Sequence, residues 1–175
     1  MEHENETILN QHLKVTRIIV AAMAGGVIVY LVMGLVKNQF GIRPLAEGVP
    51  IESLIALIMF FPALGFSWFL PRILLPGMLQ QVKSGTFRVP NSRATMSDGR
   101  ILEQLLAIRN TTLIISLAIL EAPGWLAGFA YYSHKDGIAL LVTLAVIALI
   151  FFHFPMSVGL QNWIDDRTKQ MEEMS

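Results

Sequence analysis

Residues 116–128 read Ser-Leu-Ala-Ile-Leu-Glu-Ala-Pro-Gly-Trp-Leu-Ala-Gly, an apolar run that contains one carboxylate and one proline. The composition of the whole chain indicates that this run lies in a membrane. Hydrophobic residues make up 54% of the chain, charged residues 15%, and the mean hydropathy is +0.56, values outside the range of soluble proteins. A charge inside hydrocarbon costs about 2.5 to 3.5 kcal/mol on insertion scales. Glu121 therefore requires a partner, a proton or a function.

Charge and cysteine content exclude several classes of function. Thirteen basic and thirteen acidic residues leave no net charge, so the composition gives no case for nucleic acid as a partner. With no cysteine there is no disulfide, no thiolate metal site and no cysteine nucleophile. The sequence contains no Gly-rich phosphate loop and no Ser-x-x-Lys or His-Glu-x-x-His pattern. We therefore predict that the protein is not an enzyme and uses no cofactor.

Four apolar runs have the length of membrane spans, at about 15–36, 51–70, 109–132 and 138–155, since roughly 20 helical residues cross the hydrocarbon core. They predict an all-α integral membrane protein with one domain, residues 1–175, built from two antiparallel hairpins. Residues 1–11 are expected to be a frayed tail. Pro71 and Arg72 are expected to end the second span, and residues 72–100 to form a polar loop with an interfacial segment at 73–79.

The third helix is expected to run from about Gly99 to Tyr132. At 1.5 Å per residue it is longer than the hydrocarbon core is thick, so its first third is expected to protrude from the membrane. The charged residues 165–175 at the end of the chain are expected to be disordered.

Basic residues predict the orientation of the chain. With four spans, both termini and the central loop share one side, which collects Lys14, Arg17, Arg72, Lys83, Arg88, Arg93, Arg100, Arg109, Arg167 and Lys169. The opposite side carries Lys37, Arg43 and Lys135. By the positive-inside rule both termini are cytoplasmic.

Glu121 is the main candidate site. It follows Arg109 by roughly 18 Å along the helix axis, so Arg109 cannot neutralise it within the same helix. The hydroxyl of Tyr30, at a comparable depth on the first span, is the expected partner. Burial favours a neutral or strongly hydrogen-bonded carboxyl. Two interpretations stay open: reversible protonation or cation binding, and a neutral Glu that holds helices together.

Ser116 and His153 complete this candidate intramembrane proton or cation site. The depth of His153 matches Ser116 better than Glu121, so a proton relay between His153 and Glu121 would need an intermediate. One histidine within the spans cannot supply two haem ligands, and a hydrogen-bonded structural histidine is the main interpretation.

Small and basic residues give two further expectations. Helix packing is expected at Ala21, Ala22, Gly25, Gly26, Gly124 and Gly128, because small residues allow close approach of helix backbones. Contact with anionic lipid is expected at Lys83, Arg88, Arg93 and Arg100. The alternative for these four residues is that they only set the topology.

The segment Leu120-Glu121-Ala122-Pro123-Gly124-Trp125 resembles the carboxylate-bearing helix of rotor-ring c subunits of ATP synthases, in which an intramembrane Glu is followed by small residues and often by Pro. This resemblance implies that Glu121 is an ion carrier. The chain departs from that family in its long central loop, in a second span without alternating glycines and in its fourth span.

The layout as a whole resembles small uncharacterised four-span membrane proteins of bacteria, which implies the inner (plasma) membrane as the location and no particular activity. We expect a self-associating or accessory subunit of a membrane complex. The alternative is a proton- or cation-translocating, rotor-like component that works through Glu121.

Overall fold

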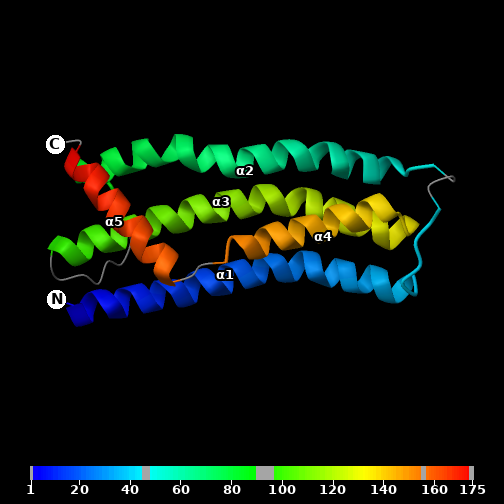
Figure 1. Cartoon of the computed structure of the whole chain (residues 1–175), viewed down its shortest axis with the longest axis horizontal. Coiled ribbons are helices and arrows are strands. Elements are labelled where there is room, and N and C mark those ends of the chain that lie inside the picture. The colour runs from blue at the N-terminus through cyan, green and yellow to red at the C-terminus, as the bar shows by residue number, and fades with distance from the viewer. Residues whose placement is uncertain (1, 45–47, 90–96, 155–156, 174–175) are drawn as a thin grey trace. The chain divides into compact units, whose positions relative to one another are not determined.

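The computed structural model describes residues 2–44, 48–89, 97–154 and 157–173. These residues form five α-helices: α1 (Glu2–Lys37), α2 (Ile51–Lys83), α3 (Ser97–His134), α4 (Gly137–Phe152) and α5 (Ser157–Glu173) (Figure 1). The prediction of an all-α protein is confirmed for the described residues.

Three helices are long and apolar enough to cross a membrane, namely Glu6–Lys37 within α1, the whole of α2, and Gly99–His134 within α3. These helices indicate a membrane-embedded protein. α4 is also apolar but has 16 residues, which is about 24 Å of helix.

The end of the second helix differs from the prediction. α2 does not stop at Pro71 but continues through Pro71 and Pro76 to Lys83, so the expected loop and its interfacial segment begin as helix. Proline inside a helix removes one backbone donor and bends the helix. Neighbouring groups in membrane proteins can satisfy the freed carbonyl, and such helices then continue.

The two ends of the chain also differ from the prediction. α1 already begins at Glu2, within the expected frayed tail. α5 covers most of the tail that was expected to be disordered. Its Leu160 is fully buried, and Trp163 and Ile164 pack against a hydrophobic cluster. Apolar residues spaced three and four apart give α5 one buried face, which explains why it is ordered.

Contacts within the chain define two compact units. The first unit comprises Met1–Ile18, Leu70–Ile114 and Pro155–Ser175, and the second comprises Ile19–Phe69 and Ile115–Phe154. The residues of α1, α2 and α3 are shared between the units, α4 belongs to the second, and α5 belongs to the first.

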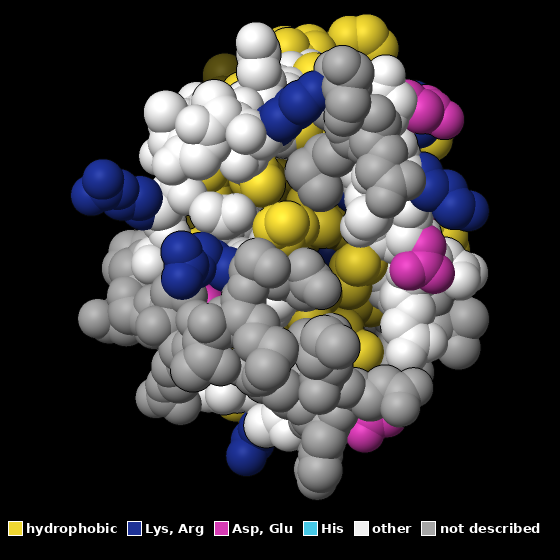
Figure 2. All heavy atoms as spheres, turned by 90° about the vertical axis from the view of Figure 1, so that its left-hand side faces the viewer, with side chains coloured by type: hydrophobic (Ala, Val, Ile, Leu, Met, Phe, Trp, Pro, Cys, Tyr) yellow, Lys and Arg dark blue, Asp and Glu magenta, His cyan; other side chains and the backbone are white. Residues whose placement is uncertain are grey.

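In the first unit, α3 packs against α1, α2 and α5. Leu13, Leu106 and Leu160 form one buried cluster, and a second consists of Leu79, Val82, Leu105 and Ile108 with Trp163 against it. Thr16 Oγ1 donates a hydrogen bond of 2.7 Å to Asn110 Oδ1, which ties α1 to α3. On the face shown in Figure 2, hydrophobic side chains are visible between Lys, Arg, Asp and Glu side chains.

In the second unit, α4 packs against α1 and α3 at a glycine (Figure 1). A Cβ atom at Gly124 would lie 2.7 Å from Val146 Cγ1 and 3.3 Å from Val27 Cγ1. Residue 124 must therefore be glycine for the three helices to approach this closely.

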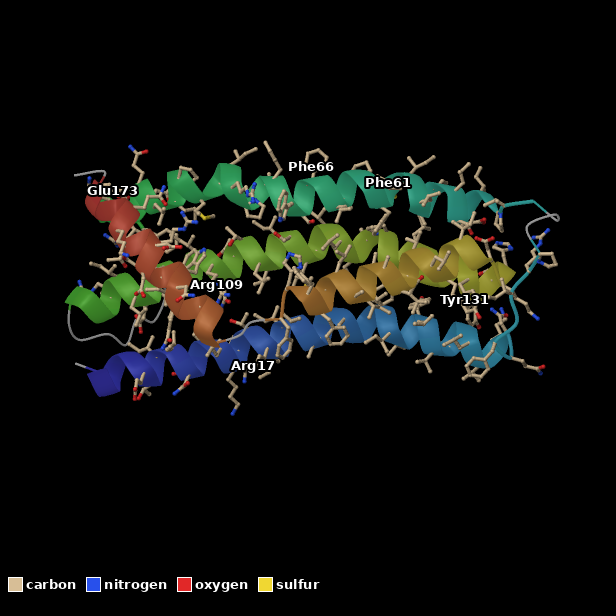
Figure 3. All side chains as sticks on the ribbon, viewed as in Figure 1. Arg17, Phe61, Phe66, Arg109, Tyr131 and Glu173 are labelled. Atoms are coloured by element: carbon tan, nitrogen blue, oxygen red, sulfur yellow. The ribbon has the colours of Figure 1, made fainter. Side chains whose placement is uncertain are left out.

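On α2, Phe61 and Phe66 point away from the other helices (Figure 3), with 62% and 60% of their surface exposed. Such exposed aromatic residues fit a lipid-facing surface.

Hydrogen bonds close the end of the second unit near residues 38 and 136. Asn38 Nδ2 donates to the carbonyl of Tyr131 at 2.7 Å, and both residues are buried. Asp136 caps α4, because its Oδ2 accepts a hydrogen bond of 3.0 Å from the backbone N–H of Ala139.

Candidate functional site

Glu121 is half-buried on α3 and faces α1 at Gly26. Its hydrogen-bond donor is Trp125, one turn later on the same helix, whose Nε1 donates to Glu121 Oε1 at 2.8 Å. A Cβ atom at Gly26 would lie 2.7 Å from Trp125 Cζ2 and 3.3 Å from Glu121 Oε1. Glycine at position 26 thus provides the space that the indole and the carboxyl group occupy. Within the described ranges no basic side chain forms an ion pair with Glu121.

Tyr30 lies close to this site, but not as the expected donor. Its ring packs edge-to-face against Trp125, with centroids 4.8 Å apart and an interplanar angle of 70°. Its Cβ is 3.1 Å from the position that a Cβ at Gly128 would take. Tyr30 therefore supports the indole that binds Glu121, and the carboxyl group receives its hydrogen bond from its own helix.

The side chains of Ser116 and His153 form hydrogen bonds with backbone carbonyl groups away from Glu121. Ser116 Oγ donates to the carbonyl of Ser67 on α2 at 2.9 Å, which ties α3 to α2. His153 follows α4 as its C-cap, and its Nδ1 lies 2.8 Å from the carbonyl oxygen of Leu149. The structure does not bring either side chain into a hydrogen bond with Glu121.

The surface beside Glu121 is apolar. On α3, exposed residues occur three and four positions apart, which places them along one side of the helix. Residues with the same spacing form a similar row along one side of α1. The packing of Trp125 on Gly26 places these rows side by side. We call this surface the Glu121 face; besides Glu121 it consists of Ala22, Gly26, Val29, Met33, Ala118, Ala122, Trp125 and Phe129.

The six small residues expected to pack helices fall into two groups. Gly26, Gly124 and Gly128 each lie against a side chain of another helix. By contrast, a Cβ at Gly25 would meet nothing within 4 Å, and Ala21 and Ala22 are exposed. The outer side of α1 is therefore open to another helix or to lipid.

The basic residues of the expected lipid contact are placed in part. Lys83, Arg88 and Arg100 are exposed, and Arg93 lies outside the described residues. Over the described ranges, no three His, Asp or Glu side chains come together in a way that could hold a metal ion.

The first unit contains a cationic cluster that the sequence interpretation missed. Arg109 Cζ on α3 and Arg167 Cζ on α5 lie 6.0 and 5.8 Å from the ring centroid of Trp163, and Figure 3 labels Arg109 where α5 passes α3. We call these three residues the Arg–Trp cluster. The available signal was the spacing of Trp163 and Arg167, four residues apart and hence on one face of a helix.

A cavity of about 620 Å³ also lies in the first unit, between α1 and α3. Its polar lining comprises Thr7, Gln11, His12, Glu103 and Asn110, and the rest of the lining is apolar. The Nε2 atom of His12 is enclosed and has no hydrogen-bond partner among the described residues.

Comparison with known proteins adds no identity: no family model matches the chain, and neither the curated proteins nor the solved structures contain a significant match.

Proposed function

We propose that this chain is a non-enzymatic membrane protein with four spans that associates with a second copy of itself through the Glu121 face. The second unit takes residues 19–37, 51–69, 115–134 and 137–152 from α1 to α4. These segments have 16 to 20 residues each, close to the ~20 needed to cross the hydrocarbon. This agreement supports α4 as the fourth span.

The distribution of charge supports cytoplasmic termini. The residue ranges of the first unit contain the ten basic residues expected on the cytoplasmic side, and those of the second unit contain Lys37, Arg43 and Lys135. The first unit is then the cytoplasmic part of the protein. The inner membrane of a bacterium is the proposed location.

The observation that carries the self-association proposal is the half-burial of Glu121. Its carboxyl group has one indole donor, lies at the edge of an apolar surface and has no basic partner within the described part of the chain. In lipid such a group is costly unless it is neutral and its remaining hydrogen-bonding capacity is met. A second copy meets that need in a dimer whose two-fold axis passes close to residue 121, because that arrangement brings one carboxyl group to the other.

The side chains around Glu121 suit such contact. Ala22, Ala118 and Ala122 are small and exposed, so the backbones of two copies can approach closely at these three positions. The O–H of a neutral carboxyl group in one copy can then donate a hydrogen bond to the carboxyl group of the other.

Disulfide cross-linking in native membranes tests this proposal, because the chain has no cysteine of its own. Ala122→Cys should give a dimer on oxidation, since residue 122 lies on the Glu121 face. Phe66→Cys is the matched control, as residue 66 is 60% exposed on α2, and it should stay monomeric. Equal cross-linking of both variants, or a monomeric mass in lipid nanodiscs, would contradict self-association through this face.

The same half-burial also favours a second candidate, a site of reversible protonation or cation binding at Glu121. The chain itself does not fully enclose the carboxyl group, and the indole donor can stabilise its charged form. Infrared difference spectroscopy across pH 5 to 9 tests this candidate. A carboxyl band that changes with pH and disappears in Glu121→Gln would support it, and a large homomeric ring would specifically favour the rotor-like form. If the infrared band of a neutral carboxyl group stays unchanged across this pH range and the protein forms a dimer, the result would support the structural role of Glu121 alone.

A further inference from the structure

We infer that the first unit binds a phosphate group at the Arg–Trp cluster, between Arg109 of α3 and Arg167 of α5. Both guanidinium groups lie within about 6 Å of the Trp163 ring, the range of a cation–π interaction. Because both guanidinium groups are positively charged and approach the same ring, they repel each other, and an anion bound to both would remove this repulsion.

The two arginines lack the counter-charge that half-buried cations usually have. Both side chains are half-buried, and neither forms an ion pair with a carboxylate in the described part of the chain. Arg167 Nη1 donates a hydrogen bond of 2.6 Å to the side-chain amide oxygen of Gln170, which is a neutral group. Buried charges in proteins are normally paired, so this cluster is incomplete as it stands.

Unused donors point in the same direction. Nη1 of Arg109 and Nε of Arg167 are both enclosed, and neither has a hydrogen-bond partner among the described residues. Buried donors without partners are rare in native proteins, and each calls for an explanation such as a bound ion. Because both nitrogens are enclosed, a ligand must displace part of what covers them, and Trp163 is the side chain whose ring both guanidinium groups approach.

The geometry of the guanidinium group selects a phosphate group as the ligand. Its planar fork offers two parallel N–H donors to phosphate oxygens, a pairing that lysine cannot reproduce. In the sequence Arg109 directly precedes the apolar part of α3, where a basic side chain meets lipid headgroups. The phosphate can belong to an anionic lipid or to a free ion, and the site is independent of the Glu121 face.

Binding is measured on the full chain in a non-ionic detergent, as the shift of its thermal unfolding temperature with increasing ligand. Three probes are compared: inorganic phosphate at constant ionic strength, dihexanoyl-phosphatidylglycerol below its micellar concentration, and dihexanoylglycerol, which has the same acyl chains without phosphate. The test variant is Arg109→Gln with Arg167→Gln. The matched control is Lys14→Gln with Lys169→Gln, which removes the same charge from exposed positions of the first unit that are not among the expected lipid contacts.

We expect phosphatidylglycerol to stabilise the protein and the neutral lipid not to do so. The test variant should bind at least about tenfold more weakly, because it loses charge-assisted hydrogen bonds, whereas the control should change by less than about twofold. Stabilisation by inorganic phosphate as well identifies a free ion as a ligand, and stabilisation by the lipid alone identifies a headgroup. Arg167→Lys keeps the charge without the fork and should also weaken binding.

Three results would overturn the inference: no stabilisation by any probe, equal stabilisation by the neutral lipid, or equal loss of binding in the control variant. If the double variant does not fold, Arg167→Lys alone decides. If the phosphate-containing probe that stabilises the unmodified protein stabilises Arg167→Lys to the same extent, the site would then be refuted.

Discussion

Gly124 and Gly25 provide a matched pair for testing the packing of the second unit. In both cases, replacement by alanine removes the cost of glycine in a helix, about 1 kcal/mol. At Gly124 the new Cβ would lie 2.7 Å from Val146 Cγ1 and 3.3 Å from Val27 Cγ1, whereas at Gly25 it would meet nothing within 4 Å. The helix-propensity gain cancels in the comparison, so the difference between the variants measures overpacking alone.

Overpacking a closely packed site costs about 1 to 3 kcal/mol. Val146 is β-branched and cannot easily turn its methyl group aside, so this range applies here. For a chain of this size each kcal/mol corresponds to roughly 2 to 4 °C in unfolding temperature. Gly25→Ala is expected to raise the midpoint by about that much, and Gly124→Ala to unfold below Gly25→Ala by roughly 2 to 12 °C.

The assay is thermal unfolding of the two purified variants in the same detergent at one scan rate. Val146→Ala supplies a further check, because it removes the methyl group that a Cβ at residue 124 would meet. In the Gly124→Ala background it should cost less than in the wild type, with a coupling of at least about 0.5 kcal/mol. Equal midpoints for the two glycine variants, or full additivity with Val146→Ala, would refute the packing of α4 against α3 at this point.

Three further predictions concern hydrogen bonds of the second unit. Asn38→Ala removes the side-chain donor to the buried carbonyl of Tyr131, which keeps the backbone N–H of Lys135, and should destabilise the chain by about 0.5 to 1.5 kcal/mol. Gln39→Ala, at an exposed position, should have little effect in the same unfolding assay. Asp136→Ala removes the cap of α4 and should cost about 1 kcal/mol, and Asp136→Asn should restore most of it; equal loss in both variants would contradict a capping role. Trp125→Phe removes the donor to Glu121 and should shift the carboxyl band of Glu121 in infrared spectra, and an unshifted band would show that this bond is not formed.

The long third helix could be predicted from the sequence, but the end of α2 could not. Apolar residues run through most of α3, and the observed limits Ser97–His134 lie within two residues of the expected ones. Pro71 and Pro76 are local signals for a helix end, yet whether a helix stops at proline depends on the groups that surround it. Those groups come from distant parts of the chain and are invisible to a local pattern.

The partner of Glu121 and the Arg–Trp cluster show two kinds of missing information. Trp125 follows Glu121 at the i, i+4 spacing that joins side chains on one helical face, so its role was readable from the sequence, although the prediction looked to another span. The approach of Arg167 to Arg109 requires α5 to pack on α3, and no local pattern predicts that contact. The charge density of residues 165–175 suggested disorder, but most of these residues belong to the same helix as Leu160, Trp163 and Ile164, whose burial anchors α5.

The close fit of Trp125 against Gly26 also constrains how this protein can evolve. Any larger residue at position 26 displaces the indole, and loss of the indole takes away the hydrogen-bond donor to Glu121. A larger residue at position 26 is therefore tolerated only if position 125 carries a smaller residue than tryptophan. Position 121 must then either lose its carboxyl group or gain a new hydrogen-bond donor. Positions 26, 121 and 125 should vary as a set among relatives of this chain, even though 26 and 121 lie on different helices.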